Sequence, residues 1–346
     1  MTDRYTCDFA ETSIFFGYDY VAPCCITPAL GVNPPQYFDN VRDLSYIQKV
    51  ESFLRCRSEL ISPSLKKDAC KNCKYRVSRA SNDRRRYETV VLSHIEFCEL
   101  SCVYCYQSDP GYPKNTKRHP YSFAAILNEM LKRDLLCDNA CFFWGGGEPM
   151  SSPEFWRTAV EIDALNYRQI INTHAVRHHP QIYETINKRT NATLVCSVDA
   201  GISETYRKIK GVDAYHIVWK NLKKYSDGGI RVLPKFIFHH QNYSEANRFI
   251  DAARDFGFQS ICFDFDLNAA FKISKVLPFQ EQFLSALEYT KKQEMQASFS
   301  GHSWCALDEA QTSSLAKALS SGCYDNTIEM DPFDKELHQI IKLQYP

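Results

Sequence analysis

Three cysteines lie close together, at Cys98, Cys102 and Cys105, with the spacing C-x3-C-x2-C. Thiolates are the usual protein ligands of iron–sulfur clusters, and three of them on one short loop can each bind one iron of a four-iron cluster. The fourth iron then has no protein ligand and can bind a substrate or cofactor, as an open position does in a catalytic metal site. The spacing therefore predicts a [4Fe–4S] cluster with one open iron.

Glycines and polar residues follow two other predicted strands. Consecutive glycines let the backbone approach a ligand without obstruction by a Cβ atom, although a flexible turn has the same composition. Because α/β folds bind ligands at the carboxyl ends of parallel strands, we interpret the glycine-rich loop after the second predicted strand as a binding loop. Ser197 and Asp199 end another strand and share a face, where they can bind ribose hydroxyls. The binding loop comprises Gly145, Gly146, Gly147, Glu148 and Pro149.

The elements that must position these residues begin at about residue 88. From there, β-branched and apolar runs alternate with segments of helical spacing, which predicts parallel βαβ units. Six strands are fewer than the eight of a closed barrel. A capping box with an early proline predicts a helix that opens at residues 151–154. The predicted strands are 89–95, 141–144, 169–173, 193–199, 231–239 and 259–267, and the other predicted helices are 122–135, 180–188, 214–225 and 244–256. After about residue 278 we expect helices only, the first of them at 280–295.

In order, spacing and strand position, these motifs resemble those of the radical SAM superfamily over about residues 88–268. Tyr104, the aromatic residue just before the third cysteine, matches the same pattern. The resemblance implies a partial (β/α)6 barrel and a [4Fe–4S] cluster on Cys98, Cys102 and Cys105. S-adenosyl-L-methionine would bind the fourth iron and be cleaved reductively, which generates a radical that abstracts hydrogen from a substrate.

The resemblance also implies roles for the remaining motif residues. Residues 145–149 would meet the methionyl amine of S-adenosyl-L-methionine. Ser197 and Asp199 would meet its ribose or its methionyl carboxylate, and Tyr104 would lie near the adenine. An electron donor such as flavodoxin or ferredoxin is the protein partner that this chemistry implies.

The amino-terminal cysteines form a second set. The C-x9-G spacing from Cys7 to Gly17, followed by a cysteine pair and a distant C-x2-C, resembles the twitch or SPASM type of auxiliary cluster domain. A second [4Fe–4S] cluster with four thiolate ligands would suit electron transfer, and a structural zinc ion on the same ligands is the alternative. The expected ligands are Cys7, Cys24, Cys70 and Cys73, with Cys25 and Cys56 as further candidates.

Strand alternation identifies the side chains expected to line the barrel. We expect these side chains to orient the substrate, and we expect Cys262 to return a hydrogen atom to a substrate radical. A small buried hydrophobic residue is the alternative interpretation of Cys262. The histidine pairs at 178–179 and 239–240 are interpreted as surface or hydrogen-bonding residues. The expected lining residues are Lys235, Cys262, Asp264 and Asp266.

Composition limits the class of partner. The chain has 41 basic and 41 acidic residues, and this balance does not favour general nucleic-acid binding. Neither a signal peptide nor a long apolar run is visible, so we expect a cytoplasmic protein without a membrane partner. The length of 346 residues predicts roughly two domains. We divide them into a cysteine-rich auxiliary-cluster domain (1–87), a radical SAM partial barrel (88–275) and a helical extension (276–346).

Three functions compete at this point. The first is a radical enzyme that acts on a small molecule, such as a sugar or nucleotide-sugar, by dehydrogenation, dehydration or epimerisation. The second is a peptide-modifying maturase, which we rank lower because cysteine loops fill residues 1–87, where a winged-helix leader-binding domain would lie. The third is a non-enzymatic iron–sulfur or zinc binding module, which would not form 5′-deoxyadenosine from S-adenosyl-L-methionine.

Overall fold

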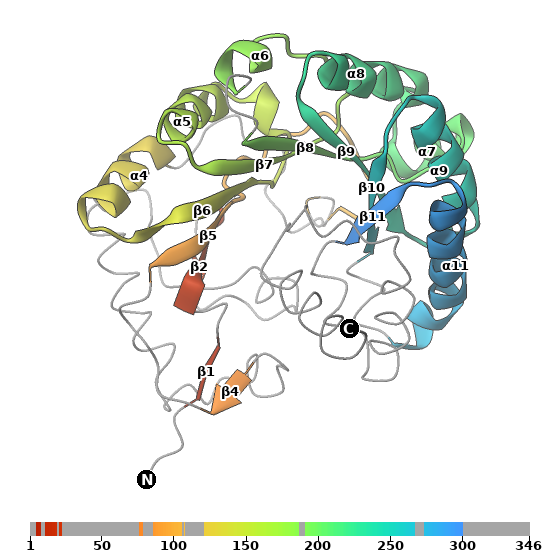
Figure 1. Ribbon diagram of the computed structural model, residues 1–346, viewed down its shortest axis with the longest axis horizontal. Coiled ribbons are helices and arrows are strands. Elements are labelled where there is room, and N and C mark those ends of the chain that lie inside the picture. Colours follow the sequence, from red (N-terminus) through yellow and green to blue (C-terminus); the bar gives the residue numbers. More distant parts are fainter. Residues whose placement is uncertain are drawn as a thin grey trace. The chain divides into compact units, whose positions relative to one another are not determined.

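The computed structural model describes residues 5–7, 11–18, 21–22, 76–78, 86–105, 107, 121–186, 191–266 and 273–299. Strands and helices alternate along most of these residues (Figure 1). The strands of the main sheet are β2 (Ser13–Phe16), β3 (Val21–Ala22), β5 (Tyr87–Leu92), β6 (Leu136–Trp144), β7 (Arg168–Thr173), β8 (Ala192–Ser197), β9 (Arg231–Phe238), β10 (Ser260–Phe265) and β11 (Gln296–Phe299).

These nine strands form one sheet in the order β11-β10-β9-β8-β7-β6-β5-β2-β3. Eight of them run parallel, and β3 is antiparallel to β2. The sheet is not closed, since β3 and β11 form its edges. The prediction of a parallel α/β partial barrel is confirmed, and the six predicted strands correspond to β5 through β10.

Two parallel strands of the sheet were not predicted. β2 pairs with β5, with Phe16 opposite Leu92, and it lies within the segment assigned to the cysteine-rich domain. β11 pairs with β10, with Ser298 opposite Cys262. The expectation of helices only after about residue 278 is therefore wrong at β11. Each strand has four residues, which is too short for a period of two to be distinguished from chance.

The helices cover one face of the strands, in each of two compact units (Figure 1). Unit 1 comprises residues 1–98, 114–171 and 184–192, and unit 2 comprises residues 99–113, 172–183 and 193–346. Helices α4 and α5 belong to unit 1, and α7, α8, α9 and α11 to unit 2. Their bounds are α4 (Phe123–Lys132), η2 (Pro149–Ser151), α5 (Pro153–Ala164), α6 (Ile182–Thr185), α7 (Ser203–Lys210), α8 (Tyr215–Asp227), η3 (Tyr243–Glu245), α9 (Ala246–Asp255) and α11 (Ile273–Lys292).

The core of unit 1 lies between β6 and the two helices α4 and α5. Trp144 packs edge-on against Phe155, with ring centroids 4.9 Å apart. The indole N–H of Trp144 donates to Gln169 Oε1 (2.9 Å), and Gln169 Nε2 donates to the carbonyl of Ala159 (3.0 Å). Gln169 is wholly buried, and because both ends of its amide are hydrogen-bonded, its burial carries little penalty.

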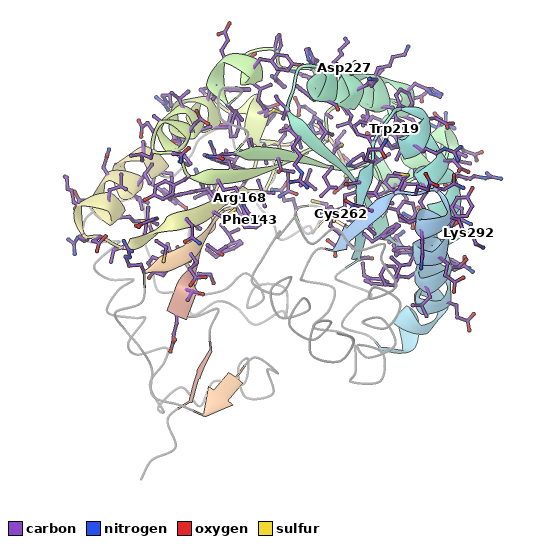
Figure 2. The ribbon with its side chains drawn as sticks, in the orientation of Figure 1. Phe143, Arg168, Trp219, Asp227, Cys262 and Lys292 are labelled. Atoms are coloured by element: carbon purple, nitrogen blue, oxygen red, sulfur yellow. The ribbon has the colours of Figure 1, made fainter. Side chains whose placement is uncertain are left out.

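Aromatic side chains also form the core of unit 2. Trp219 of α8 stacks on Phe256 and contacts Phe249 of α9 (Figure 2). Phe263 and Phe283 pack against each other between β10 and α11, with ring centroids 5.8 Å apart. Burying an aromatic side chain of this size contributes about 1.5–3 kcal/mol relative to exposure. This packing therefore fixes the helices against the outer face of β9 and β10.

Helix α5 begins as the sequence predicts, but its capping residues differ. Ser152 is the N-cap, and its side chain accepts a hydrogen bond from the N–H of Glu154 (3.2 Å). The predicted box from Ser151 to Glu154 does not form. Instead, the Glu154 carboxylate accepts hydrogen bonds from Phe123 N (2.9 Å) and Ser122 Oγ (3.2 Å) at the start of α4. Glu154 therefore caps a neighbouring helix, where a negative charge is favoured.

A separate two-stranded sheet pairs β1 (Tyr5–Cys7) with β4 (Arg76–Ser78). The strands are antiparallel, and Cys7 lies opposite Arg76. The other predicted auxiliary ligands, Cys24, Cys70 and Cys73, lie outside the described residues, as do residues 300–346. Across the part of the chain that the structure describes, every helix is too short or too polar to span a bilayer.

Candidate functional site

In unit 1, the loop after β6 runs alongside the segment after β5. Three backbone hydrogen bonds join them beyond the ends of the strands, so the ladder continues as far as Phe97. Phe97 directly precedes Cys98, the first predicted iron ligand. The predicted binding loop is thus bonded to the residues that lead into the cysteine motif. The bonds run from Gly145 N to Leu92 O (2.9 Å), from Gly147 N to Ile95 O (2.5 Å) and from Glu148 N to Phe97 O (2.6 Å).

Two glycines of this loop leave no room for a side chain. A Cβ atom on Gly147 would lie 2.2 Å from the carbonyl oxygen of Phe97, and one on Gly146 would lie 2.4 Å from that of Ile95. Gly146 also has a left-handed backbone, with φ of +84°, which favours glycine. We expected these glycines to make space for a ligand. Here they allow two backbone segments to approach each other.

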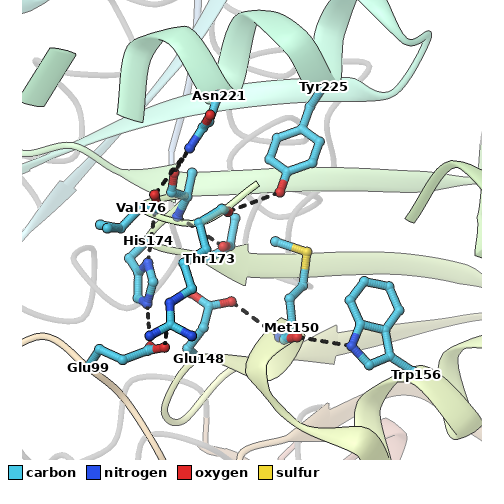
Figure 3. Close-up of polar contacts among 11 residues, drawn as sticks. Glu99, Glu148, Met150, Trp156, Thr173, His174, Val176, Asn221 and Tyr225 are labelled. Carbon is cyan, nitrogen blue, oxygen red and sulfur yellow. Dashed lines mark hydrogen bonds and ion pairs between the residues drawn. The ribbon is translucent and has the colours of Figure 1, made fainter. Parts of the chain in front are cut away.

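Glu148 and Pro149 connect the loop to helix α5. The Glu148 side chain is 1% exposed, and it accepts a hydrogen bond from Met150 N (3.2 Å) at the start of η2. The carbonyl of Met150 in turn accepts from Trp156 Nε1 (3.0 Å) on α5 (Figure 3). The end of the loop is therefore fixed by a buried carboxylate and an aromatic N–H.

In unit 2, the loop at residues 99–105 carries Cys102 and Cys105. The N–H of Cys105 donates to the carbonyl of Cys102 (3.1 Å), which closes a tight turn, and both side chains are half-buried. The N–H groups of Ser101 and Val103 donate to the carbonyls of Lys210 (3.3 Å) and Ile209 (3.0 Å) at the end of α7. Helix ends leave such carbonyls without an intrahelical partner. The cysteine loop supplies those partners.

A cluster of three polar side chains, two of them buried, adjoins this loop. The ammonium of Lys210 pairs with Asp199 Oδ2 and donates to the hydroxyl of Tyr104 (2.5 Å). The Tyr104 hydroxyl donates to the same carboxylate oxygen. The side chains of Lys210 and Asp199 are 3% and 0% exposed. Tyr104 lies between the two predicted cysteine ligands, so this cluster is built directly into the cysteine loop.

The charges of this cluster affect its neighbours. Burial alone would lower the pKa of Lys210, but Asp199 and the Cys102 thiol raise it above its usual value, so the ammonium stays charged. Burial, reinforced by the Asp199 carboxylate, raises the pKa of Tyr104 well above 10, so the phenol stays protonated. Burial raises the pKa of the Cys102 thiol, and the charge of Lys210 opposes that rise.

Asp199 owes its position to a turn rather than to strand alternation. β8 ends at Ser197, two residues earlier than predicted, and Asp199 has a left-handed backbone with φ of 57°. Its Oδ1 accepts from the N–H of Ile237 (2.7 Å), and its carbonyl accepts from the side-chain amide of Asn242 (2.8 Å). Ser197 is half-buried and lies opposite Lys235 in the β8–β9 register. Ser197 and Asp199 therefore do not share a strand face, contrary to the prediction.

A second charged group holds the start of the cysteine loop. Glu99, the residue after Cys98, places Oε2 3.0 Å from His174 Nε2 and Oε1 3.3 Å from Arg177 Nε (Figure 3). The hydrogen bond from His174 lowers the pKa of Glu99 to about 2 against the opposing effect of burial, so the carboxylate is ionised. His174 follows the last residue of β7 directly.

The inner face of β9 and β10 carries the other predicted polar residues. Lys235 Nζ lies 3.6 Å from Asp264 Oδ2, with side chains 12% and 10% exposed. Cys262 is wholly buried and lies opposite Lys235 in the strand register. Phe265 on the other face of β10 packs against Phe283 of α11, with centroids 5.1 Å apart. The structure therefore separates the polar and apolar faces as the alternation predicts.

His239 belongs to the same polar face and is buried, with 4% of its surface exposed. Its Nδ1 accepts from the N–H of Gln241 (3.3 Å), so its proton is on Nε2, which lies 3.7 Å from Asp266 Oδ2. Its ring centroid is 6.0 Å from that of Tyr104. Burial, with the neighbouring His240, lowers the pKa of His239 to about 4, so the ring is neutral at pH 7.

Some of these groups carried no sequence signal that we used. Lys210 stands on α7, an eight-residue helix whose apolar positions are too few to reveal it. The Glu99–His174 contact joins residues 75 positions apart. Among the described residues, no three His, Cys, Asp or Glu side chains are gathered closely enough to hold a metal ion. The three-cysteine ligand set therefore stays a prediction.

The fold and this arrangement define a class of protein: an open parallel α/β barrel in which a cysteine motif follows strand β5. Residues 92–253 match the radical SAM superfamily. The chain therefore contains a domain of that superfamily, in agreement with the resemblance seen in its motifs.

Curated relatives resemble part of the sequence of this chain, and solved structures resemble its fold. The mycofactocin maturase MftC of Mycobacterium tuberculosis (strain CDC 1551 / Oshkosh) is 22% identical over 166 residues, which are 46% of this chain and 40% of that protein. The structure of Streptococcus suis SuiB bound to precursor peptide SuiA superposes with a TM-score of 0.52 at 16% identity, over 72% of this chain and 54% of that one. Native anSMEcpe with bound AdoMet gives 0.52 at 14% identity, over 68% of each chain.

These relatives are similar to the chain over part of their own length. The matched region spans 40% of the curated maturase and about half of SuiB. At these identities the solved structures support the fold. The substrate and the reaction are therefore taken up as proposals.

Proposed function

We propose that the protein is a radical SAM enzyme that modifies a peptide. Cys98, Cys102 and Cys105 would hold a [4Fe–4S] cluster, and S-adenosyl-L-methionine would bind beside it. The bound cluster and S-adenosyl-L-methionine would together supply a radical able to abstract hydrogen from an unactivated C–H bond. The remaining assignments concern what the side chains of this chain do around that chemistry.

The observation that carries the proposal is the buried cluster on the cysteine loop. Tyr104 lies between two cysteines of the motif and is hydrogen-bonded to Lys210, whose ammonium is paired with Asp199. Cys102 and Cys105 lie on one tight turn, and cysteine sulfurs are the ligands that iron–sulfur clusters use. The donor type therefore fits the cluster, and the joint ligation by all three cysteines is part of the proposal.

Each group of this cluster has a role that its chemistry allows. The buried ammonium of Lys210 neutralises Asp199 and holds the hydroxyl of Tyr104, so it keeps the cysteine loop in place. Asp199 and the half-buried hydroxyl of Ser197 are our candidates for meeting the ribose or the methionyl carboxylate. The Tyr104 ring provides an aromatic surface for the adenine. Residues 145–149, held against the segment before Cys98, would meet the methionyl amine.

The inner face of β9 and β10 would orient the substrate. Lys235 and Asp264 form a partly buried pair, and Asp266 faces the neutral His239. Polar groups that are buried on a strand face rather than packed in the core can recognise polar parts of a substrate. Cys262 on the same face remains our candidate for returning a hydrogen atom to a substrate radical.

The choice of a peptide rests on the relatives. MftC is named a maturase, and SuiB is described with a bound precursor peptide. These names favour the peptide-modifying function over the small-molecule function that we ranked first from the sequence. The third function, a non-enzymatic binding module, gives no reason for a domain of the radical SAM superfamily.

A cleavage assay tests the proposal. Anaerobically reconstituted protein, dithionite and S-adenosyl-L-methionine should yield 5′-deoxyadenosine and methionine, and Cys102→Ala should abolish this product. Incubation with a uniformly deuterated peptide library should transfer deuterium into 5′-deoxyadenosine, whereas deuterated sugars and nucleotide-sugars should not. Failure to form 5′-deoxyadenosine would reject the reaction, and transfer from sugars alone would reject the peptide substrate.

We also propose an auxiliary metal site on Cys7, Cys24, Cys70 and Cys73. The β1–β4 pairing supports it, because Cys7 lies opposite Arg76, a residue only three positions after Cys73 in the sequence. Metal analysis separates the two candidate occupants. About eight irons per chain support two [4Fe–4S] clusters, and about four irons with one zinc support a structural zinc ion.

A further inference from the structure

Glu99 is a carboxylate inside the cysteine motif, and the proposed reaction gives it no role. It directly follows Cys98 and precedes Cys102 by three residues. Its two oxygens have separate partners, His174 at 3.0 Å and Arg177 at 3.3 Å. The side chain of His174 is 9% exposed and that of Glu99 is 21% exposed. The contact is therefore largely shielded from water, where a charge-assisted hydrogen bond is strong.

The hydrogen bonds of His174 define its direction. Its Nδ1 accepts from the N–H of Val176 (3.1 Å), so the ring proton is on Nε2 and is donated to Glu99. The backbone around His174 is fixed by its neighbours. Ala175 has a left-handed φ of 52°, and its N–H donates to Thr173 Oγ1 (3.1 Å) at the end of β7.

Helix α8 holds the loop that carries His174. The side-chain amide of Asn221 donates to the carbonyls of Ala175 (2.9 Å) and Val176 (3.2 Å). The hydroxyl of Tyr225 donates to the carbonyl of Arg177 (3.2 Å) and accepts from the N–H of His179 (2.8 Å). Asn221 and Tyr225 are both buried, and both extend from α8 toward this loop (Figure 3). His174 therefore projects from a loop that is held against α8 by hydrogen bonds.

Besides Tyr104, which is hydrogen-bonded to Lys210 and Asp199, the cysteine loop has two further anchors within unit 2. Its middle is bonded to the end of α7 through Ser101 and Val103. Its start is bonded to His174 through Glu99. The first anchor uses backbone groups alone, whereas the second depends on two side chains and places a negative charge beside the motif.

We propose that His174 is a positioning residue for the cysteine loop: through Glu99 it fixes the loop that carries Cys102 and Cys105, and it holds a negative charge next to the iron site. Side chains that orient the ligands of a metal tune both its affinity and its electronic properties. Net charge near an iron–sulfur cluster sets its reduction potential, and a nearby anion disfavours the added electron. Only the effect of the charge on the cluster rests on the proposed function.

The positioning is tested in metal-free, reduced protein by the rate of thiol alkylation, mapped by mass spectrometry. His174→Phe keeps a ring of similar size and removes the donor. It should accelerate alkylation of Cys102 and Cys105 by about tenfold, since a hydrogen bond to a charged group is lost. His174→Gln, which keeps an amide N–H donor, should restore a rate near that of the unmodified chain.

Two controls make this result specific. His178→Phe alters a histidine of the same loop whose Nε2 contacts Tyr183 rather than Glu99, and it should leave the Cys102 rate unchanged. Cys137 on β6 of unit 1 is an internal reference in every variant. An unchanged Cys102 rate in His174→Phe overturns the proposal, and so does an equal acceleration of Cys137, because that would indicate general loosening.

The charge is tested in reconstituted protein by an electron paramagnetic resonance titration of the midpoint potential. Glu99→Gln keeps an acceptor for His174 and removes the negative charge, so the potential should shift in the positive direction. An unchanged or more negative potential contradicts the assigned role of the charge. If no cluster can be reconstituted in the unmodified chain, the proposed function fails while the alkylation result still decides the positioning role.

Discussion

The binding loop at residues 145–149 (the glycine loop) and the cysteine loop at residues 99–105 are held in place by different interactions. In unit 1, Gly146 and Gly147 lie against backbone carbonyls, and three main-chain hydrogen bonds join the two segments. In unit 2, the cysteine loop depends on buried charges as well, those of Lys210 and Asp199 and of Glu99. The comparison shows that the glycine loop has no room for a side chain at Gly146 and Gly147. The stability of the cysteine loop, in contrast, can be changed by removing a charge.

The largest effect is expected at the buried ion pair. Lys210→Met removes the ammonium and leaves Asp199 ionised and unpaired in a site from which water is excluded. Such a loss costs about 3–5 kcal/mol of unfolding free energy, measured by urea denaturation. Lys208→Met on the exposed side of the same helix should change stability by less than about 0.5 kcal/mol.

The double variant Lys210→Met/Asp199→Asn sharpens this prediction. It removes both charges, so it should be more stable than Lys210→Met alone. If the single variant loses less than about 1 kcal/mol, buried charge does not hold this side of the motif, and the contrast with the glycine loop fails.

The next effect is expected at the glycine loop. Gly147→Ala places a methyl group 2.2 Å from a backbone oxygen that cannot move away freely, and should cost about 3 kcal/mol by overpacking. Gly257→Ala is the matched control, since a Cβ there meets nothing within 4 Å and only the positive φ opposes it. The control should cost about 1–2 kcal/mol. Equal losses in the two variants would show that steric contact is not what selects glycine at position 147.

A pH-dependent effect is expected from His239. Its pKa is lowered from 6.5 to about 4 in the folded protein, so between these values the unfolded chain binds a proton that the folded chain does not. Stability should therefore fall as pH decreases from about 6.5 to 4, by on the order of 2 kcal/mol. The Glu99 carboxylate acts in a lower window, because its pKa of about 2 is depressed from 4.5. A His239→Gln variant with the same pH profile as the unmodified chain would contradict the assignment.

The smallest effect is expected at the start of α4. Glu154→Ala removes the carboxylate that accepts from Phe123 N (2.9 Å). Loss of an N-cap costs about 1 kcal/mol, and hydrogen exchange should speed up in the first turn of α4 rather than in α5. Faster exchange in α5 instead would mean that Glu154 caps its own helix after all.

The sequence was sufficient to predict β5 through β10, because each has several consecutive β-branched or apolar residues between turn residues. It was not sufficient for β2, β11 and α7, which are short and have few apolar positions. The cysteine spacing, the glycine loop and Asp199 are local signals and were recognised. Lys210, Glu99 and His174 act through contacts between distant segments, and no periodicity encodes these.

The joint between the cysteine loop and the end of α7 couples two events that are remote in sequence. The N–H groups of Ser101 and Val103 occupy the last carbonyls of the helix, so fraying of that helix and release of the loop are one opening reaction. A ligand that binds the cysteines must therefore also stabilise the final turn of α7, by thermodynamic linkage. The amide protons of that turn are a remote reporter on whether the cysteines are engaged.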